Sequence, residues 1–139
     1  MSTLETTPTT RDAVQAFIAG WNAHSPKAVR DAFTADGRLC DPVVPSWTSG
    51  EAIEAAVQRA LDRYTDVAFT VRSVLEAPDE RVAFEWRMTM AVVTSDGRRI
   101  PMQLEGVDVC RVRDGKIAEL RGYFDRAAIG EQLKAAGLA

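Results

Sequence analysis

The sequence contains few of the residues that build metal sites and disulfide frameworks. Its 139 residues include one histidine, His24, and two cysteines, Cys40 and Cys110. Two cysteines do not make the disulfide framework of a small secreted domain, and one histidine excludes mechanisms that need two. The spacing of cysteine and histidine also matches no zinc motif. We therefore expect a reducing, cytoplasmic location and no bound metal.

Long apolar runs and an excess of positive charge are missing as well. The chain has 17 Lys and Arg residues against 20 Asp and Glu residues, which gives a net charge of −3. Nucleic-acid-binding domains usually carry a basic excess, so we expect no nucleic-acid partner. The apolar runs are far shorter than the ~20 residues that cross a bilayer. Residues 1–10 have no basic start and no apolar run, so we expect no signal peptide and no membrane partner.

The chain does have enough apolar residues to bury a core. Apolar residues make up 46% of the sequence and charged residues 27%, which at this length fits one globular domain. Residues 1–9 are polar and rich in threonine, and we interpret them as a flexible tail. The single domain is then expected to cover residues 10–139.

Helical spacing of apolar residues predicts three helices in the first half of the chain. A Ser-Pro pair is typical of the start of the second helix, and the sequence TSGE before the third resembles a capping box. A short strand candidate separates the second helix from the third. We expect Asp125 to cap a fourth, short helix near the end of the chain. The predicted bounds are about 10–23, 26–35 and 51–64 for the first three helices, and 38–43 for the strand.

After Tyr64 the apolar period changes from that of a helix to the alternation of strands. Turn-forming pairs such as Asp96-Gly97 and Asp114-Gly115 separate the alternating segments. Consecutive strands joined by short turns form an antiparallel meander. Helices grouped against one such sheet predict the α+β class. The predicted strands cover residues 67–77, 81–94, 99–113 and 116–123.

Asp108 is the one charged side chain on the apolar face of the strand 99–113. Alternation predicts that its neighbours on that face include Leu104 and Cys110, with Trp86 contributed by the preceding strand. Burial disfavours a charged carboxylate, so the pKa of Asp108 should rise, and a raised carboxyl is a candidate acid or hydrogen-bond donor. The alternative is a buried aspartate that bonds a backbone amide or a water molecule and does no chemistry.

Asp41 is the second candidate for a catalytic role. The following residue, Pro42, restricts Asp41 to an extended backbone, which suits a strand end. The alternative interpretation is an ordinary turn-initiating aspartate before proline. Trp47 stands close by in a loop that contains Pro45, and we expect it to cover the opening of a cavity. Other large apolar residues either line that cavity or form simple core; they are Phe17, Trp21, Trp86, Met88, Leu104 and Phe124.

The order and spacing of several short motifs resemble those of the NTF2-like superfamily, especially its SnoaL-like and ketosteroid-isomerase-like members. The resemblance covers roughly residues 10–135. It implies a cone-shaped α+β fold in which a curved antiparallel sheet carries helices on its concave face. The motifs are Trp21-Asn22-Ala23, Phe33-Thr34-Ala35-Asp36, Asp41-Pro42, Gly50, Gly106-Val107-Asp108-Val109, Arg113-Asp114-Gly115-Lys116-Ile117 and Tyr123-Phe124-Asp125.

The resemblance also implies roles for the two acids. In ketosteroid-isomerase-like members, the aspartate at the position of Asp41 is the general base, and that at the position of Asp108 is neutral and donates a hydrogen bond to the enolate oxygen. Phe17 stands where those isomerases place a tyrosine. Their second, supporting tyrosine is also missing, and Val57 stands near its position. We count Val57 among the residues that line the substrate pocket.

Together these observations predict a small acid–base enzyme that needs no cofactor. It would move a proton on an apolar, carbonyl-containing ligand of steroid or polyketide type, with Asp41 as the proton shuttle and Asp108 as the neutral acid. The alternative is a non-catalytic module that binds a hydrophobic molecule or mediates dimerisation. Charged residues on the outer sheet face either pair on the surface or form a homodimer interface, which the resemblance favours; they are Glu85, Arg87, Glu105, Arg111, Glu119 and Arg121.

Overall fold

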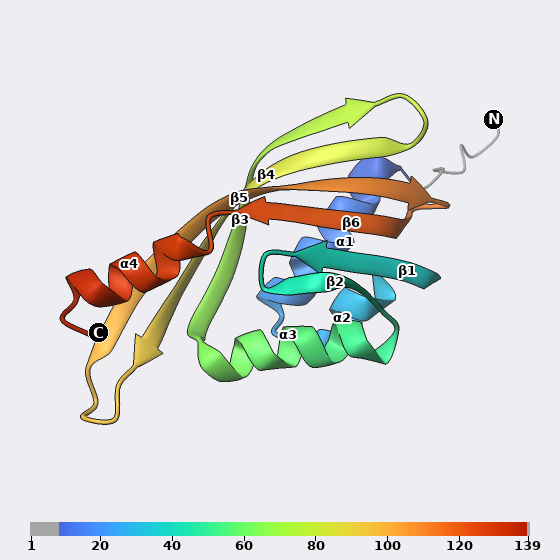
Figure 1. Ribbon diagram of the computed structural model, residues 1–139. Helices are drawn as coiled ribbons and strands as arrows, with labels where there is room; N and C mark the ends of the chain where they lie inside the picture. The colour runs from blue at the N-terminus through green and yellow to red at the C-terminus, as the bar shows by residue number, and fades with distance from the viewer. Residues whose placement is uncertain (1–8, 139) are drawn as a thin grey trace, which may run out of the picture.

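The computed structural model describes residues 9–138, which form one curved sheet with the first three helices on its concave side and the last helix apart from them beside β5 (Figure 1). This arrangement confirms the predicted α+β class and the cone-shaped fold. In chain order, the elements are α1 (Thr10–Asn22), α2 (Pro26–Asp31), β1 (Phe33–Asp41), β2 (Val44–Ser49), α3 (Glu51–Arg63), β3 (Thr65–Ala77), β4 (Arg81–Val93), β5 (Arg99–Arg113), β6 (Lys116–Phe124) and α4 (Ala127–Ala135).

The sheet has six strands in the order β2-β1-β6-β5-β4-β3. Strands β3 to β6 form the predicted antiparallel meander, and β1 joins it by pairing parallel to β6. The β5–β6 turn is tight because Asp114 and Gly115 both have positive φ, 53° and 76°. A two-residue turn of this kind matches the twist of the strands that it joins.

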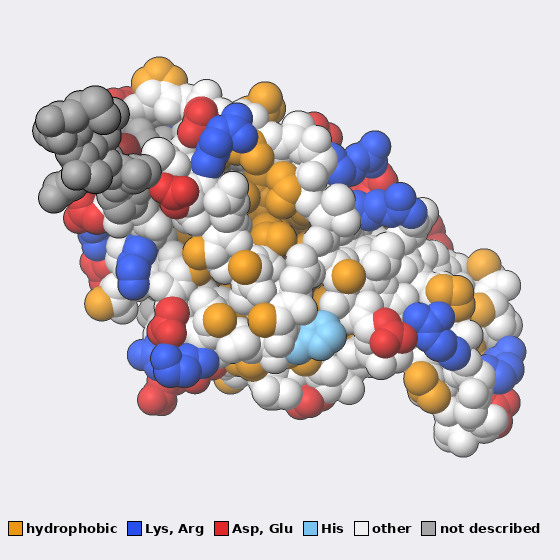
Figure 2. Space-filling model, turned by 180° about the vertical axis from the view of Figure 1, so that it is seen from behind, with side chains coloured by type: hydrophobic (Ala, Val, Ile, Leu, Met, Phe, Trp, Pro, Cys, Tyr) orange, Lys and Arg blue, Asp and Glu red, His pale blue; other side chains and the backbone are white. Residues whose placement is uncertain are grey.

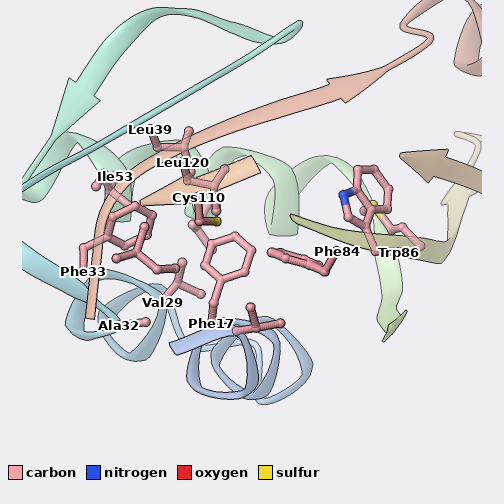
Figure 3. Close-up of a cluster of buried hydrophobic side chains, with 14 of the residues drawn as sticks. Phe17, Val29, Ala32, Phe33, Leu39, Ile53, Phe84, Trp86, Cys110 and Leu120 are labelled. Atoms are coloured by element: carbon pink, nitrogen blue, oxygen red, sulfur yellow. The ribbon is translucent and has the colours of Figure 1, made fainter. Parts of the chain in front are cut away.

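Alternation along β4 and β5 separates a core face from a solvent face. In β4, Phe84 and Trp86 are buried, while the alternating residues Glu85 and Arg87 are exposed. The buried face meets α1, where Phe17 packs edge-on against Phe84 at 6.2 Å between ring centroids. Figure 3 shows this cluster, with Trp86 lying beyond Phe84. The opposite side of the molecule from Figure 1 mixes both signs of charge around a hollow where hydrophobic side chains reach the surface (Figure 2).

The second helix is shorter than its sequence predicts. It ends at Asp31 rather than near Ala35, and β1 begins at Phe33. The cause is a non-local hydrogen bond, because the amide of Ile117 in β6 donates to the carbonyl of Ala32 at 2.9 Å. Pairing with β6 therefore draws the chain into the sheet where local spacing still favours a helix.

The segment between β1 and α3 also differs from its prediction. Residues 44–49 form an edge strand, β2, rather than a loop, and Pro45 is tolerated there because an edge strand does not need every amide. The expected capping box is not formed, since Gly50 precedes α3 with a φ of 60° and without a side-chain cap. Only glycine adopts such a backbone at little cost.

The two ends of the domain are fixed by polar side chains. Most of the predicted flexible tail lies outside the described residues, but Thr9 is described and forms a capping box with Asp12 at the start of α1. Near the other end, Asp125 accepts a hydrogen bond from the amide of Ala127 at 3.0 Å, although Arg126 is the residue that precedes α4. Gln132 then joins α4 to the backbone of Gln103 in β5.

Helices α1 and α2 approach each other most closely at Gly20. A Cβ built there would lie 2.7 Å from the backbone nitrogen of Val29 and 3.0 Å from the carbonyl carbon of Ala28. Because these are backbone atoms, the contact cannot be relieved by a side-chain rotation. By contrast, a Cβ on Gly130 in α4 would meet nothing within 4 Å.

We predict that Gly20→Ala and Gly130→Ala change stability in opposite directions. Alanine favours a helix over glycine by up to ~1 kcal/mol, so Gly130→Ala should raise the free energy of unfolding slightly. Gly20→Ala should lower it by about 1–3 kcal/mol, because the helices must separate. Urea unfolding followed by circular dichroism measures both, and an equal gain for the two variants would contradict the packing described here.

Candidate active site

A cavity of about 290 Å³ lies between the concave face of the sheet and the helices. Its wall is mainly apolar, and an aromatic series runs along it, with Phe69 5.4 Å and Phe124 5.9 Å from the ring of Trp86. The charged side chains that reach it are two acids from the sheet and two arginines from α3. The lining residues are Phe17, Trp21, Leu39, Asp41, Val43, Val44, Ala56, Arg59, Ala60, Arg63, Tyr64, Phe69, Trp86, Met88, Met90, Leu104, Asp108, Leu120, Phe124 and Ile129.

Asp108 projects from β5 into this cavity and is 6% exposed, the one buried charged residue in the described part of the chain. The indole Nε1–H of Trp86 donates to its Oδ1 at 2.9 Å. Gly106 makes this bond possible, because it faces Trp86 across the β4–β5 pair, where a Cβ would lie 2.8 Å from the indole Cε2. The ring therefore lies across the glycine and reaches the residue two positions further along β5.

Burial raises the pKa of Asp108 to about 7, with a smaller contribution from the nearby charge of Asp41 and against the opposing effect of the Trp86 hydrogen bond. The carboxyl is therefore largely protonated below neutral pH. No buried polar side-chain atom of residues 9–138 lacks a hydrogen-bond partner. Since Oδ2 of Asp108 has no bond from the protein, it is open to the cavity.

Asp41 ends β1 in a different electrostatic setting. Its Oδ1 accepts hydrogen bonds from the amides of Val43 at 2.8 Å and Val44 at 2.9 Å. Burial raises the pKa of Asp41, and these two amide bonds partly offset the effect because they favour the carboxylate. Both carboxyls in the cavity thus have a raised pKa, but only Asp41 receives two backbone amide bonds that favour its anion.

Gly122 in β6 brings the two acids together. It pairs with Asp108 across β5–β6, and β1 lies on its other side. A Cβ at Gly122 would lie 2.9 Å from Oδ1 of Asp108 and 3.0 Å from the Cβ of Asp41. The absence of a side chain at this position leaves the space in which the two acidic side chains face the same cavity.

The structure places most of the sequence-predicted pocket residues at the cavity wall. Phe17, Trp21, Trp86, Met88, Leu104 and Phe124 all line it together with Asp41 and Asp108. Val57 is not among the lining residues and packs in the core cluster instead. Trp47 does not line the cavity either, because its ring lies under the guanidinium carbons of Arg38 at 4.1 Å and Arg121 at 5.1 Å. As part of β2, Trp47 faces these side chains and not the cavity.

Sequence reasoning missed the contribution of α3 to the cavity. Ala56, Arg59, Ala60 and Arg63 all line it, at the spacing of one helical face. The apolar spacing identified residues 51–64 as a helix, but apart from Val57 it assigned none of them to the cavity wall. The signal was available, since two alanines on a face that also carries arginine leave room beneath the longer side chains.

The cysteines take no part in this arrangement. Cys110 is buried, and burial together with the charge of Asp108 raises the pKa of its thiol well above the usual value. The thiol is therefore a poor nucleophile. Cys40 lies outside the cavity wall, where its Sγ contacts the carbonyl of Pro45. Within residues 9–138, no three His, Cys, Asp or Glu side chains lie close enough to hold a metal ion.

Comparison with known proteins places this architecture in a family. The sequence model of the SnoaL-like domain matches residues 14–120. The chain belongs to the SnoaL-like domain family. No curated protein sequence matches it. Within the described part of the chain, none of the helices is long and apolar enough to cross a membrane.

Solved structures share the SnoaL-like fold at low sequence identity. A protein of ketosteroid-isomerase-like fold from Catenulispora acidiphila, in complex with trimethylamine, is 24% identical with a TM-score of 0.78, over 96% of each chain. IdmH from Streptomyces antibioticus, provisionally assigned as a polyketide cyclase, is 18% identical with a TM-score of 0.77, over 90% of this chain and 98% of that one. A protein from Shewanella denitrificans, provisionally assigned as a SnoaL-like polyketide cyclase, is 14% identical with a TM-score of 0.75, over 91% and 97%.

We predict that Asp108 makes the stability of the protein depend on pH. Its pKa is about 7 when folded against a usual 3.8, so the folded state holds a proton that the unfolded state releases between these values. The contribution of Asp108 is fully present below about pH 4 and is lost as the pH rises through about 7, by at most about 4 kcal/mol. Asp108→Asn should remove this slope. Urea unfolding at several pH values measures it, and parallel profiles for the two proteins would contradict the prediction.

Proposed function

We propose that this protein is an acid–base enzyme that moves a proton on a carbon next to a carbonyl group of a hydrophobic ligand. The observation that carries the proposal is the pair of carboxyls, Asp41 and Asp108, in one apolar cavity with unequal surroundings. Titratable groups whose environments separate their pKa values are a general feature of acid–base sites. The SnoaL-like relatives provisionally assigned as polyketide cyclases are consistent with a ligand of this type.

In the proposed reaction, the carboxylate of Asp41 removes a proton from the α-carbon, and the electron pair of the C–H bond moves onto the carbonyl oxygen. The protonated carboxyl of Asp108 donates a hydrogen bond to the resulting enolate oxygen. Asp41 then returns the proton, to the same carbon or to another. Trp86 supports this role, because its N–H occupies Oδ1 of Asp108 and leaves Oδ2 to carry the proton toward the cavity.

The cavity wall also limits which substrates can react. Phe17 has no hydroxyl to supply a second oxyanion donor, and one such donor is typically worth ~10²–10³ in rate. We therefore propose that the substrates have activated α-protons, such as those flanked by a second carbonyl or by an aromatic ring. A volume of about 290 Å³ lies at the lower end of ligand pockets, which suits a compact molecule of few rings.

A second candidate is a non-catalytic module that holds the same kind of ligand. The observation that favours it is again Phe17, because a binding site has no need of the missing hydroxyl. The two candidates differ in one outcome: a binding module would hold an apolar ketone without exchanging its α-protons.

We predict that the protein accelerates exchange of the acidic α-protons of 2-tetralone in deuterated buffer. Proton NMR measures the rate above the buffer background. Asp41→Asn should lower it by about 10²–10⁴-fold, because the general base is lost. Asp79→Asn, which changes an exposed aspartate of the β3–β4 turn, is the matched control and should leave the rate unchanged. Binding of 2-tetralone without exchange would support the binding module instead.

The pH profile of the exchange should identify Asp108 as the acid. The rate should fall at low pH as Asp41 gains a proton, and again as the pH rises through about 7, where Asp108 loses its own. Asp108→Asn keeps an N–H donor that does not titrate, so the variant should retain part of the rate and lose the alkaline fall. A variant that keeps the alkaline fall would remove Asp108 from the mechanism.

We also propose a homodimer that forms through the outer face of the sheet. Tyr123 is 53% exposed beside the layer of Arg38, Trp47 and Arg121, and exposed aromatic and arginine side chains are typical of protein interfaces. Separately, we propose a cytoplasmic location, as the sequence predicts. Two charged pairs border this surface, with Arg38 bonded to Glu119 at 2.7 Å and Arg72 bonded to Glu105 at 2.8 Å.

Tyr123→Glu tests the proposed dimer, since it places a charge on the exposed aromatic side chain of this surface. Sedimentation velocity should give a dimer for the wild type and a monomer for the variant, both with the same far-ultraviolet circular dichroism. A monomeric wild type at micromolar concentration would contradict the proposal.

A further inference from the structure

The charged side chains around the cavity divide into an acidic group and a basic group. Asp41 and Asp108 come from neighbouring parts of the sheet, beside Gly122. Arg59 and Arg63 come from α3, which covers the cavity from the helical side. Both arginines are exposed, so their guanidinium groups belong to the rim, whereas Asp108 lies deep in the site.

Helix geometry explains why these two arginines reach the cavity together. Residues four positions apart on a helix have Cβ atoms about 5–6 Å from each other on the same side. Ala56 and Ala60 complete this side of α3, and their small side chains keep the space open beneath the longer ones. Arg63 also lies over the ring of Tyr64, with 5.6 Å between its guanidinium carbon and the ring centroid, and Tyr64 lines the cavity too.

Neither arginine is neutralised by the protein. The ion pairs formed among residues 9–138 do not include Arg59 or Arg63, although many other arginines of the chain take part in them. The acidic side chain nearest in sequence, Asp62, accepts a hydrogen bond from Gln58 at 2.8 Å. The surroundings of Asp41 point the same way, because burial and two amides govern its pKa and no cation does.

We infer that the ligand of this cavity carries a carboxylate at the end opposite its reacting carbonyl, and that Arg59 and Arg63 bind that carboxylate. The position of the carbonyl rests on the proposed function; the anion site does not. Two guanidinium groups one helical turn apart can share the two oxygens of a carboxylate through charge-assisted hydrogen bonds. The anion also reduces the cost of holding two cations beside an apolar wall.

The same layout fixes the direction in which such a ligand enters. A carboxylate turned inward would meet the anionic Asp41 and would be desolvated among Trp86 and Phe69, which costs far more than leaving it at the rim. The rim position keeps the carboxylate hydrated and lets the apolar body and the carbonyl enter first. The arginines therefore act in orientation and capture of the ligand, and because they are exposed their effect on affinity is modest, about tenfold.

Binding of two matched probes tests the inference. The first is 2-tetralone with a carboxylate on its aromatic ring, and the second is the methyl ester of that compound. Isothermal titration calorimetry should give wild-type binding of the acid about tenfold tighter than of the ester, with the difference shrinking as salt is added. The double variant Arg59→Met and Arg63→Met should bind both probes alike. A control double variant, Arg72→Met and Arg98→Met, removes the same charge from the outer face and a distant turn and should keep the preference.

The outcomes separate this inference from the proposed chemistry. Equal wild-type affinities, binding of neither probe, or an unchanged preference in the folded Arg59 and Arg63 double variant would each overturn the anion site. Deuterium exchange on the same probes reports the chemistry independently. A preference for the acid without exchange would support the anion site and contradict the proposed acid–base activity. Exchange without the preference would support the activity and contradict the anion site.

Discussion

The hydrogen bond from the Trp86 indole to Asp108 is the contact on which the rest of the site depends. It holds a carboxyl in apolar surroundings, where burial raises the pKa to about 7 and the neutral form is favoured below that pH. The bond also sets the direction of the acid, since one oxygen faces the indole and the other faces the cavity. Without this contact Asp108 would be an unpaired buried polar group, a costly feature with no defined orientation.

Two glycines make the contact sterically possible. Gly106 lets the indole cross β5, and Gly122 leaves the space that Asp108 and Asp41 share. Any larger residue at either position would displace the acid or the ring that orients it. The site is therefore specified as much by two missing side chains as by the acids. Its cost to stability is concentrated at Asp108, whose raised pKa is a penalty on the folded state at neutral pH.

The sequence predicts the central strands of the sheet better than the edge strand and the helix end that pair with it. Alternation in β4 and β5 is strictly local, so it located the inner face and correctly placed Asp108 among the buried residues on it. The end of α2 and the strand β2 depend on pairing with β6 and β1, which no local pattern records. Trp47 illustrates the same limit, because its position is decided by Arg38 and Arg121, which are distant in sequence from each other. That Asp41 and Asp108 share one cavity likewise follows from strand order.

The two arginines that sequence reasoning missed, Arg59 and Arg63, show why hydrophobic periodicity does not identify residues that line a cavity. A helix that only packs against a sheet buries its apolar face and leaves arginine in water. In α3, Ile53 and Val57 follow that rule, but Arg59 and Arg63 stand over a cavity that the helix covers without filling. A fold that encloses a cavity has some faces that are neither core nor outer surface. The residues on those faces suit the binding of a ligand rather than the packing of the chain. The polarity of this cavity, acidic within and basic at the rim, is therefore better explained by the molecule it receives than by the stability of the chain.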